Sequence, residues 1–304
     1  MKRKIIKQGN NALTISLPVN WTRERNLDAG HEIDVKLVGK DLIVSSDKQK
    51  GFETIKINAS GLNPIIKRYL AALYRAGYDE VEVNYEDEEA LELIHEVIEK
   101  ELIGFEIVKQ GKKSCSIKDI SGMENEEFDV LLRRCFLLLS AIAEESHEHI
   151  KKKNTRALKH IKHKDKNINK LTNFCERMLI KKNGKGVKQT AFLYHLIKEI
   201  ENIGDEYKFM SNYCCKKKTF PSKRIINLHE DINKLLSDMH HLFYKFENKS
   251  ITEIELKISE LKQKVKELFK SNKDNMPLYH LGNILRRLET MIGSYFSLRV
   301  DHNA

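Results

Sequence analysis

Residues 193–207 read LYHLIKEIENIGDEY, and their apolar side chains recur at the spacing of a helix with one buried face. Gly204 lies inside this pattern, where a glycine destabilises a helix by roughly 1 kcal/mol relative to alanine. Glu201 and Asp205 are four residues apart, so they share one helical face and repel each other unless a positive charge lies nearby. The stretch therefore predicts a long helix with an acidic pair that needs a positive partner.

A related pattern, LETMIGSY, returns 88 residues later at 288–295. The matching positions are Ile200 and Leu288, Glu201 and Glu289, Ile203 and Met291, and Tyr207 and Tyr295. From about residue 124 onward the sequence consists of six helical patterns joined by short links. The repeat falls in the third and sixth of them, which predicts two tandem three-helix bundles over residues 124–304.

The segment IENIGDEY, 200–207, resembles the third-helix signature of the PhoU family, which is an apolar residue, Glu, any residue, Ile, Gly and Asp. PhoU proteins are tandem three-helix bundles that regulate phosphate uptake and can bind metal ions through Glu and Asp clusters. The resemblance implies that Glu201 and Asp205 hold a divalent or ferric ion with oxygen ligands from adjacent helices. Hard oxygen ligands favour Mg, Mn, Ca or iron. Gly293 replaces Asp205 in the second repeat, so we expect one weak site per chain.

A purely structural role for this helix is the alternative. Glu201 would then pair with a basic residue on another helix, and Gly204 would allow two helices to pack closely. The histidines match no catalytic metal spacing, and the sequence contains no Gly-rich phosphate loop and no nucleophile elbow. We therefore expect a protein without enzymatic activity.

Residues 1–47 read as short strands, a short helix and a hairpin. In NALTISLP, 11–18, Leu13, Ile15 and Leu17 alternate with polar residues as in a half-buried strand. Pro18 suits the first turn of a helix, and Gly39-Lys40 is placed to turn a hairpin. So small a core needs a second chain to complete it, which predicts a homodimer.

The order RKIIKQGNNALTISLPVNWTRERNLDAGHEIDVKLVGKDLIVSS resembles the AbrB/MazE/SpoVT swapped-hairpin family. That family forms an interleaved homodimeric β barrel and usually binds double-stranded DNA. The resemblance implies DNA contacts by Lys2, Arg3, Lys4, Lys7, Asn10, Asn11, Arg23 and Arg25. The family often has an arginine just after the glycine where this chain has Asn10-Asn11, and asparagine either reads base edges or makes the tight turn. Dimerisation without DNA binding is the alternative.

Residues 52–121 read strand, helix, strand, helix and a closing hairpin around Gly111, which is a small α+β domain. The whole chain is therefore expected to be multidomain α+β, with a swapped-hairpin barrel, this small domain and the helical bundles. The net charge of +10 lies mostly in residues 124–304 and suggests a nucleic acid or another anionic partner. No long apolar run and no signal-peptide pattern occur, so we expect a cytoplasmic protein without membrane insertion.

Two hypotheses for the function follow. The first is a DNA-binding transcriptional regulator of archaeal style, linked to phosphate uptake, in which the PhoU-like region senses a ligand, metal or partner. The second is a PhoU-type signalling adaptor that docks on a transporter or a sensor kinase and uses its N-terminal barrel only to dimerise.

Overall fold

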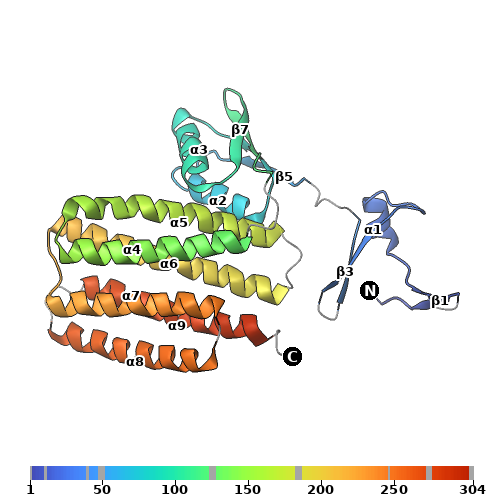
Figure 1. The fold of residues 1–304 in the computed structure, drawn as a ribbon. Coiled ribbons are helices and arrows are strands. Elements are labelled where there is room, and N and C mark those ends of the chain that lie inside the picture. The colour runs from blue at the N-terminus through green and yellow to red at the C-terminus, as the bar shows by residue number, and fades with distance from the viewer. Residues whose placement is uncertain are drawn as a thin grey trace. The chain divides into compact units, whose positions relative to one another are not determined.

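The computed structural model describes residues 2–9, 12–38, 41–46, 52–122, 128–181, 187–245, 247–271 and 276–300. The chain divides into two compact units, Met1–Phe52 and Glu53–Ala304, called here the N-terminal unit and the C-terminal unit (Figure 1).

The N-terminal unit contains two short hairpins and one short helix. Its elements are β1 (Ile6–Gln8), β2 (Ala12–Thr14), α1 (Val19–Glu24), β3 (Asp34–Val38) and β4 (Asp41–Ser45). Strands β1 and β2 pair antiparallel with Ile6 opposite Thr14, and β3 and β4 pair antiparallel with Val38 opposite Asp41. The antiparallel pairing predicted on either side of Gly39-Lys40 is therefore present, while these two residues lie outside the described part of the chain. The described strands form two separate two-stranded sheets and no closed barrel, so the two-chain swapped-hairpin barrel stays a prediction.

The described side chains of the N-terminal unit are all exposed or only partly buried. Leu13, Leu37 and Leu42 expose 71%, 75% and 65% of their surface. Burying a leucine side chain is worth about 1.5–3 kcal/mol, so a single copy of this unit forgoes most of the stabilisation that its apolar residues offer.

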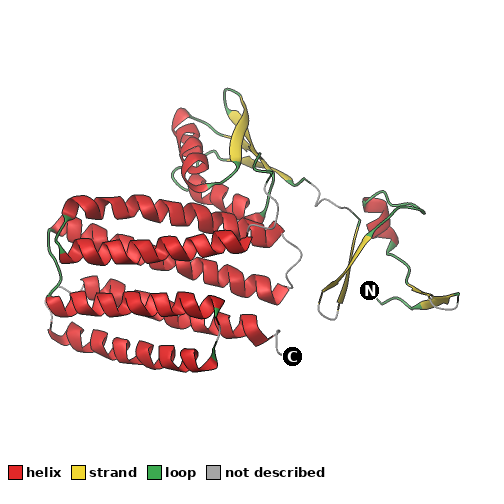
Figure 2. Cartoon of the chain, viewed as in Figure 1, coloured by secondary structure: helices red, strands yellow, loops and turns green. Residues whose placement is uncertain are grey.

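The first part of the C-terminal unit is an α/β layer (Figure 2). Its elements are β5 (Thr54–Asn58), α2 (Ile66–Ala76), β6 (Glu80–Asn84), α3 (Glu88–Glu101), β7 (Phe105–Gln110) and β8 (Ser114–Asp119). The strand order is β5-β6-β8-β7, with β5 and β6 parallel and the other pairs antiparallel. Helix α2 ends at Gly77, whose φ of 99° is left-handed, and Asp87 caps α3 by accepting from the Ala90 N–H at 2.8 Å. The element order predicted for this segment is confirmed.

Six long helices form the rest of the C-terminal unit as far as its residues are described. They are α4 (Phe128–Lys151), α5 (Thr155–Lys181), α6 (Val187–Lys217), α7 (Lys223–Tyr244), α8 (Asn248–Ser271) and α9 (Met276–Val300). Helices α4, α5 and α6 pack against one another as a first bundle, and α7, α8 and α9 as a second bundle. The bundles meet chiefly through α6 against α9 and α4 against α7. The predicted arrangement of two sets of three helices is therefore present.

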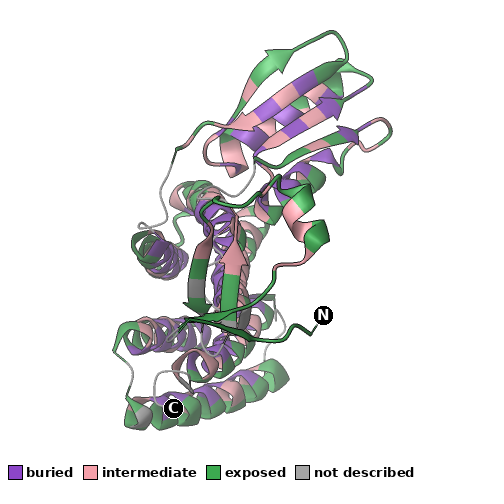
Figure 3. Ribbon diagram, turned by 90° about the vertical axis from the view of Figure 1, so that its right-hand side faces the viewer, coloured by how far each residue is buried: buried purple, intermediate pink, exposed green. Residues whose placement is uncertain are grey.

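The two third helices, α6 and α9, bury the apolar and tyrosine residues that the repeat places at matching positions, whereas Glu201 and Glu289 are only partly buried. Figure 3 shows buried residues on the faces by which the helices pack against one another. Ile200 and Leu288 are both fully buried, and Tyr207 and Tyr295 expose 0% and 2% of their surface. Each tyrosine hydroxyl has a partner: Tyr207 donates to Asn233 Oδ1 at 2.7 Å, and Tyr295 donates to a backbone carbonyl of α7 at 3.1 Å. The sequence repeat is therefore also a repeat in packing.

Arg177 on α5 fastens the α/β layer to the first bundle. Its guanidinium is 2% exposed and donates to the carbonyl oxygens of Tyr74 and Tyr78 at 2.8 and 2.7 Å. It also pairs with Asp79 at 3.2 Å and with Asp119 at 2.8 Å. Buried charges are tolerated when they are paired and fully hydrogen-bonded. The boundary expected between residues 52–121 and 124–304 thus falls inside one compact unit.

Candidate functional site

The acidic pair on α6 has lysine partners on the same helix. Glu201 forms an ion pair with Lys198, three residues earlier, and Asp205 forms one with Lys208, three residues later. The positive partner required by the sequence is therefore present, although the structural alternative placed it on another helix. We call Lys198, Glu201, Asp205 and Lys208, together with Asp165 of α5, the charged cluster.

Lys208 joins two helices within this cluster. Its Nζ lies 2.8 Å from Asp165 Oδ2, and the same ammonium pairs with Asp205. Burial raises the pKa of the Asp165 carboxyl to about 6, although the hydrogen bond from Lys208 acts in the opposite direction. Burial alone would lower the pKa of Lys208, but its hydrogen bonds to Asp165 and Asp205 hold that pKa above its ordinary value. The other carboxyl oxygen of Asp165 is buried and has no hydrogen-bond partner among the described residues.

Gly204 faces α5 at the centre of the cluster. A Cβ built on Gly204 would lie 3.4 Å from Ile168 Cδ1 and 3.6 Å from Asp165 Oδ1, both on α5. These are ordinary van der Waals distances, so an added methyl group would touch α5 without a clash. Close packing alone therefore does not require glycine at this position.

The charged cluster contains carboxylates that could bind a metal ion, but their arrangement is not that of a metal site. Within the described residues, no group of three or more His, Cys, Asp or Glu side chains is placed to hold a metal ion. Lysine ammonium groups pair with the carboxylates that would bind an ion, so an ion would have to displace Lys198 or Lys208. Metal binding by Glu201 and Asp205 stays a prediction.

The second bundle shows how the repeat has diverged. Glu289, the counterpart of Glu201, pairs with Lys262 of α8 instead of a lysine on its own helix. Gly293 replaces Asp205, and nothing lies within 4 Å of a Cβ built there. The acidic pair is thus confined to α6.

A second polar group connects α6 to α9. Arg287 of α9 places NH1 3.3 Å from Glu199 Oε2 and NH2 3.7 Å from Glu206 Oε1. His280 Nδ1 lies 2.7 Å from Glu206 Oε2 in a contact that is over nine-tenths buried. Burial works to raise the pKa of Glu206, but hydrogen bonds from His280 and Asn283 keep that pKa below its ordinary value.

This group extends to His195, whose Nδ1 lies 2.8 Å from Ser294 Oγ. The sequence shows only that His195 and Glu199 are four residues apart. In the structure, His195 Nε2 lies 3.8 Å from Glu199 Oε1. The partner of His195 on α9 is Ser294, 99 positions later, and the partner of Glu199 is Arg287, 88 positions later. Local periodicity carries no information about such partners, so sequence reasoning missed the connection.

The N-terminal cations assigned to DNA contacts are exposed. Lys2, Arg3 and Lys4 precede β1, Lys7 lies in β1, and Arg23 and Arg25 lie in and just after α1. The Arg25 guanidinium lies 5.7 Å from the Trp21 ring centroid, and its NH1 donates to the Ser46 hydroxyl at 3.4 Å. Asn10 and Asn11 lie outside the described residues. The DNA-contact assignment stays a prediction for all eight positions.

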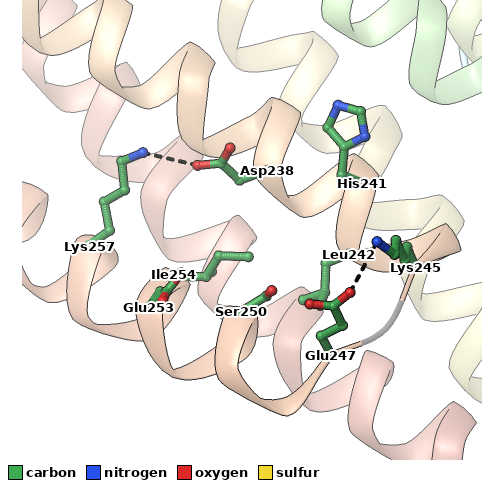
Figure 4. A pocket seen from close by; sticks show the side chains of 9 residues that line it. All are labelled: Asp238, His241, Leu242, Lys245, Glu247, Ser250, Glu253, Ile254 and Lys257. Atoms are coloured by element: carbon green, nitrogen blue, oxygen red, sulfur yellow. Dashed lines mark hydrogen bonds and ion pairs between the residues drawn. The ribbon is translucent and has the colours of Figure 1, made fainter.

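A pocket of about 510 Å³ lies between the end of α7 and the start of α8 (Figure 4). Asp238 and Lys257 pair across its lining at 3.0 Å, and Lys245 and Glu247 pair at 3.2 Å. The remaining lining residues are His241, Leu242, Ser250, Glu253 and Ile254. Because both lysines of the lining have carboxylate partners, the pocket presents no unpaired lysine to an anionic ligand.

Comparisons with known proteins add little to these observations. No family model matches the chain, and no curated protein matches it. One similar solved structure is the crystal structure of the phosphate transport system regulatory protein PhoU from Streptococcus pneumoniae, with 13% sequence identity and a TM-score of 0.43. The similarity covers 59% of this chain and 95% of that one. No helix of the described part is both long and apolar enough to cross a membrane.

Proposed function

We propose that this chain is a non-enzymatic regulator of the PhoU type, a homodimeric adaptor that links phosphate uptake to a transporter or a sensor kinase. The observation that carries the proposal is the repeat of α6 in α9, with matching positions buried in two tandem three-helix bundles. The resemblance of residues 200–205 to the PhoU signature supports the assignment to phosphate uptake.

Several polar side chains inside the bundles have a structural role. Ser146 and Ser211 bond each other at 3.0 Å, and Asn233 accepts from Tyr207 while its amide donates to a carbonyl of α4 at 2.7 Å. Fully partnered side chains of this kind fix helices in place.

Phosphate uptake by cells of the source organism tests this role. A strain that lacks the chain should take up radiolabelled phosphate at a high rate even in phosphate-rich medium, and the full chain should restore repression. Uptake that is unaffected by the deletion in both rich and poor medium would contradict the proposal.

Homodimerisation through residues 1–47 is part of the proposal. The support is the exposure of Leu13, Leu37 and Leu42 in a unit without a buried side chain among its described residues. Residues 53–304 have their own core, so a chain without residues 1–52 should stay folded. Light scattering at micromolar concentration should give twice the chain mass for the full protein and the single-chain mass for the truncated one. A monomeric full-length protein would rule out the swapped hairpin.

DNA binding is the second candidate, favoured by the exposed cations around β1 and on α1. Duplex affinity governed by phosphate contacts falls steeply with salt concentration. Replacing Lys4 and Arg23 by alanine should weaken binding across all sequences and reduce the salt slope by about one for each lost contact. Duplex binding that is weak, independent of sequence and unchanged by both substitutions would exclude the DNA-binding role and leave the adaptor role as the remaining candidate.

A further inference from the structure

One end of the C-terminal unit carries a dense group of cations. Residues 149–164 contain seven Lys or Arg and no Asp or Glu, and residues 213–224 contain five and none. These stretches form the end at which α4 is followed by α5 and α6 by α7 (Figure 1). We call them the basic end. Two of its lysines have acidic partners, Lys152 with Glu148 and Lys164 with Glu145, and the described residues show no ion pair for the other ten cations.

The two stretches lie side by side. Ser146 of α4 and Ser211 of α6 bond each other at 3.0 Å inside the first bundle, and each is followed five residues later by a triplet of lysines, 151–153 and 216–218. Because α4 and α6 run in the same direction here, both triplets lie at the same height above that bond (Figure 1). Cys215 Sγ also lies 3.5 Å from the Thr155 carbonyl oxygen, which brings the end of α6 to the start of α5.

Helix stability explains only part of this charge, namely Lys151, Lys216 and Lys217 in the last turns of α4 and α6. Cations stabilise the C-terminal end of a helix, whereas acidic residues are preferred in the first turn. Helix α7 nevertheless begins with Lys223 and Arg224, α5 has Arg156 as its second residue, and neither helix has an acid in its first turn. The partial positive charges at the N-termini of these two helices therefore add to the charge of the nearby lysines, and no acid in the first turn balances them.

The last lysine of each triplet occupies a backbone position that favours glycine. Lys153 and Lys218 have φ of 53° and 52°, in the left-handed region just after α4 and α6 end. Glycine takes this conformation without the steric penalty of a Cβ, and it is the usual residue there. At both ends the chain has a charged side chain at a position where glycine would be more stable, which indicates a use for the charge.

We infer that the basic end docks on the surface of a lipid bilayer rich in anionic headgroups. Ten of the twelve cations are lysines, which act as flexible point charges, whereas arginine is the preferred residue for bidentate phosphate recognition in nucleic acids. They are spread over the ends of four helices and not along one helix that could enter a groove. None of the exposed large apolar residues lies in the two stretches, so the contact is electrostatic and involves no insertion.

The range of this attraction fits the dimensions of the basic end. A helix rises 1.5 Å per residue, so Lys159 and Lys162 lie within about 10 Å of the start of α5. The Debye length at physiological salt is about 8 Å. A flat anionic surface beneath the turns is thus within reach of both triplets together with the first two turns of α5. This docking goes beyond the regulatory role proposed above and does not depend on the N-terminal unit.

Co-sedimentation with lipid vesicles tests the inference on the full chain. We expect binding to phosphatidylcholine vesicles that contain about one third phosphatidylglycerol, no binding to phosphatidylcholine alone, and loss of binding at about 0.5 M salt. The variant Lys153→Gly with Lys218→Gly should reduce vesicle partitioning roughly tenfold or more. Its melting temperature should not fall, because glycine relieves the left-handed backbone. Lys151→Gln with Lys216→Gln should reduce partitioning equally without a change of backbone.

The matched control is Lys112→Gln with Lys113→Gln, which removes two exposed charges from the turn between β7 and β8. It should bind vesicles like the wild type. Equal loss in the control, or vesicle binding that neither basic-end variant reduces, would overturn the inference. If the basic-end variants instead lose affinity for duplex DNA while vesicle binding is absent, the surface is a nucleic-acid site and the lipid assignment is wrong. A failure of the phosphate-uptake experiment would leave these outcomes unaffected.

Discussion

Glu199 pairs with Arg287, the residue that occupies its own position in the second repeat, 88 places later. Their closest atoms, Oε2 and NH1, are 3.3 Å apart. When two copies of one element pack about a two-fold axis, a residue on that axis meets its own copy. Two glutamates would repel at such a point. With Arg287 at the position of the second glutamate, the contact between α6 and α9 is attractive. The pair therefore favours packing of α6 against α9 over packing of two identical helices.

Arg287→Ala should lower the free energy of unfolding by about 3 kcal/mol, because it removes the guanidinium that pairs with two mostly buried carboxylates. Both Glu199 and Glu206 would lose their guanidinium. Glu199→Gln should cost less, since Glu206 keeps Arg287 as a partner. Urea denaturation of the three proteins measures the difference. A loss below about 0.5 kcal/mol for Arg287→Ala would place this pair among ordinary surface ion pairs.

Gly204→Ala should stabilise the protein by up to about 1 kcal/mol, because alanine favours the helix and the new Cβ would make ordinary contacts with α5. Gly77→Ala is the opposite control. Its φ of 99° is unfavourable for alanine, and the new Cβ would lie 3.2 Å from Lys181 Cγ, so it should destabilise. Thermal unfolding compares the two. Destabilisation by Gly204→Ala would show that the packing of α5 against α6 requires glycine at this position.

Asp165 should make stability depend on pH. Its carboxyl has a pKa of about 6 in the folded chain, above its ordinary value of 3.8. A raised pKa contributes stability that is fully present below about pH 4 and is lost as the pH rises through 6. Asp165→Asn resembles the protonated side chain at every pH. Relative to the wild type, the variant should therefore gain about 3 kcal/mol of unfolding free energy between pH 4 and pH 7. The opposite trend in urea denaturation would mean that the ion pair with Lys208 outweighs burial.

Metal binding at Glu201 and Asp205 has to compete with lysines. Lys208→Met should remove that competition at Asp205 and Asp165, so millimolar Mg²⁺ or Mn²⁺ should raise its melting temperature more than that of the wild type. Adding Asp205→Asn should abolish the response. If neither the wild type nor Lys208→Met responds to either ion, the acidic pair has no metal function.

Local spacing was enough to predict the helices, the repeat and the hairpins. The pattern of Ile200, Ile203 and Tyr207 specifies a buried face whichever helices cover it. The lysine partners of the acidic pair were not predicted, since the structural alternative placed the partner on another helix. Their three-residue spacing on α6 could have indicated them, because residues three apart meet on a helix surface.

Contacts between distant segments were beyond that reasoning. Asp165 joins the charged cluster only because α5 packs against α6, and Arg287 reaches Glu199 only because α6 packs against α9. The N-terminal barrel was inferred from composition and a resemblance. One chain cannot display an interleaved two-chain structure.

The buried guanidinium of Arg177 also limits how this protein can be taken apart. A cut between residues 122 and 128 would separate Arg177 from Asp79 and Asp119, leaving each side with charges that only the other side neutralises. Uncompensated buried charges cost several kcal/mol. The α/β layer is therefore not expected to fold or to be exchanged independently of the bundles. Any gene fusion, truncation or domain exchange that preserves folding should therefore carry residues 53–304 together as one unit.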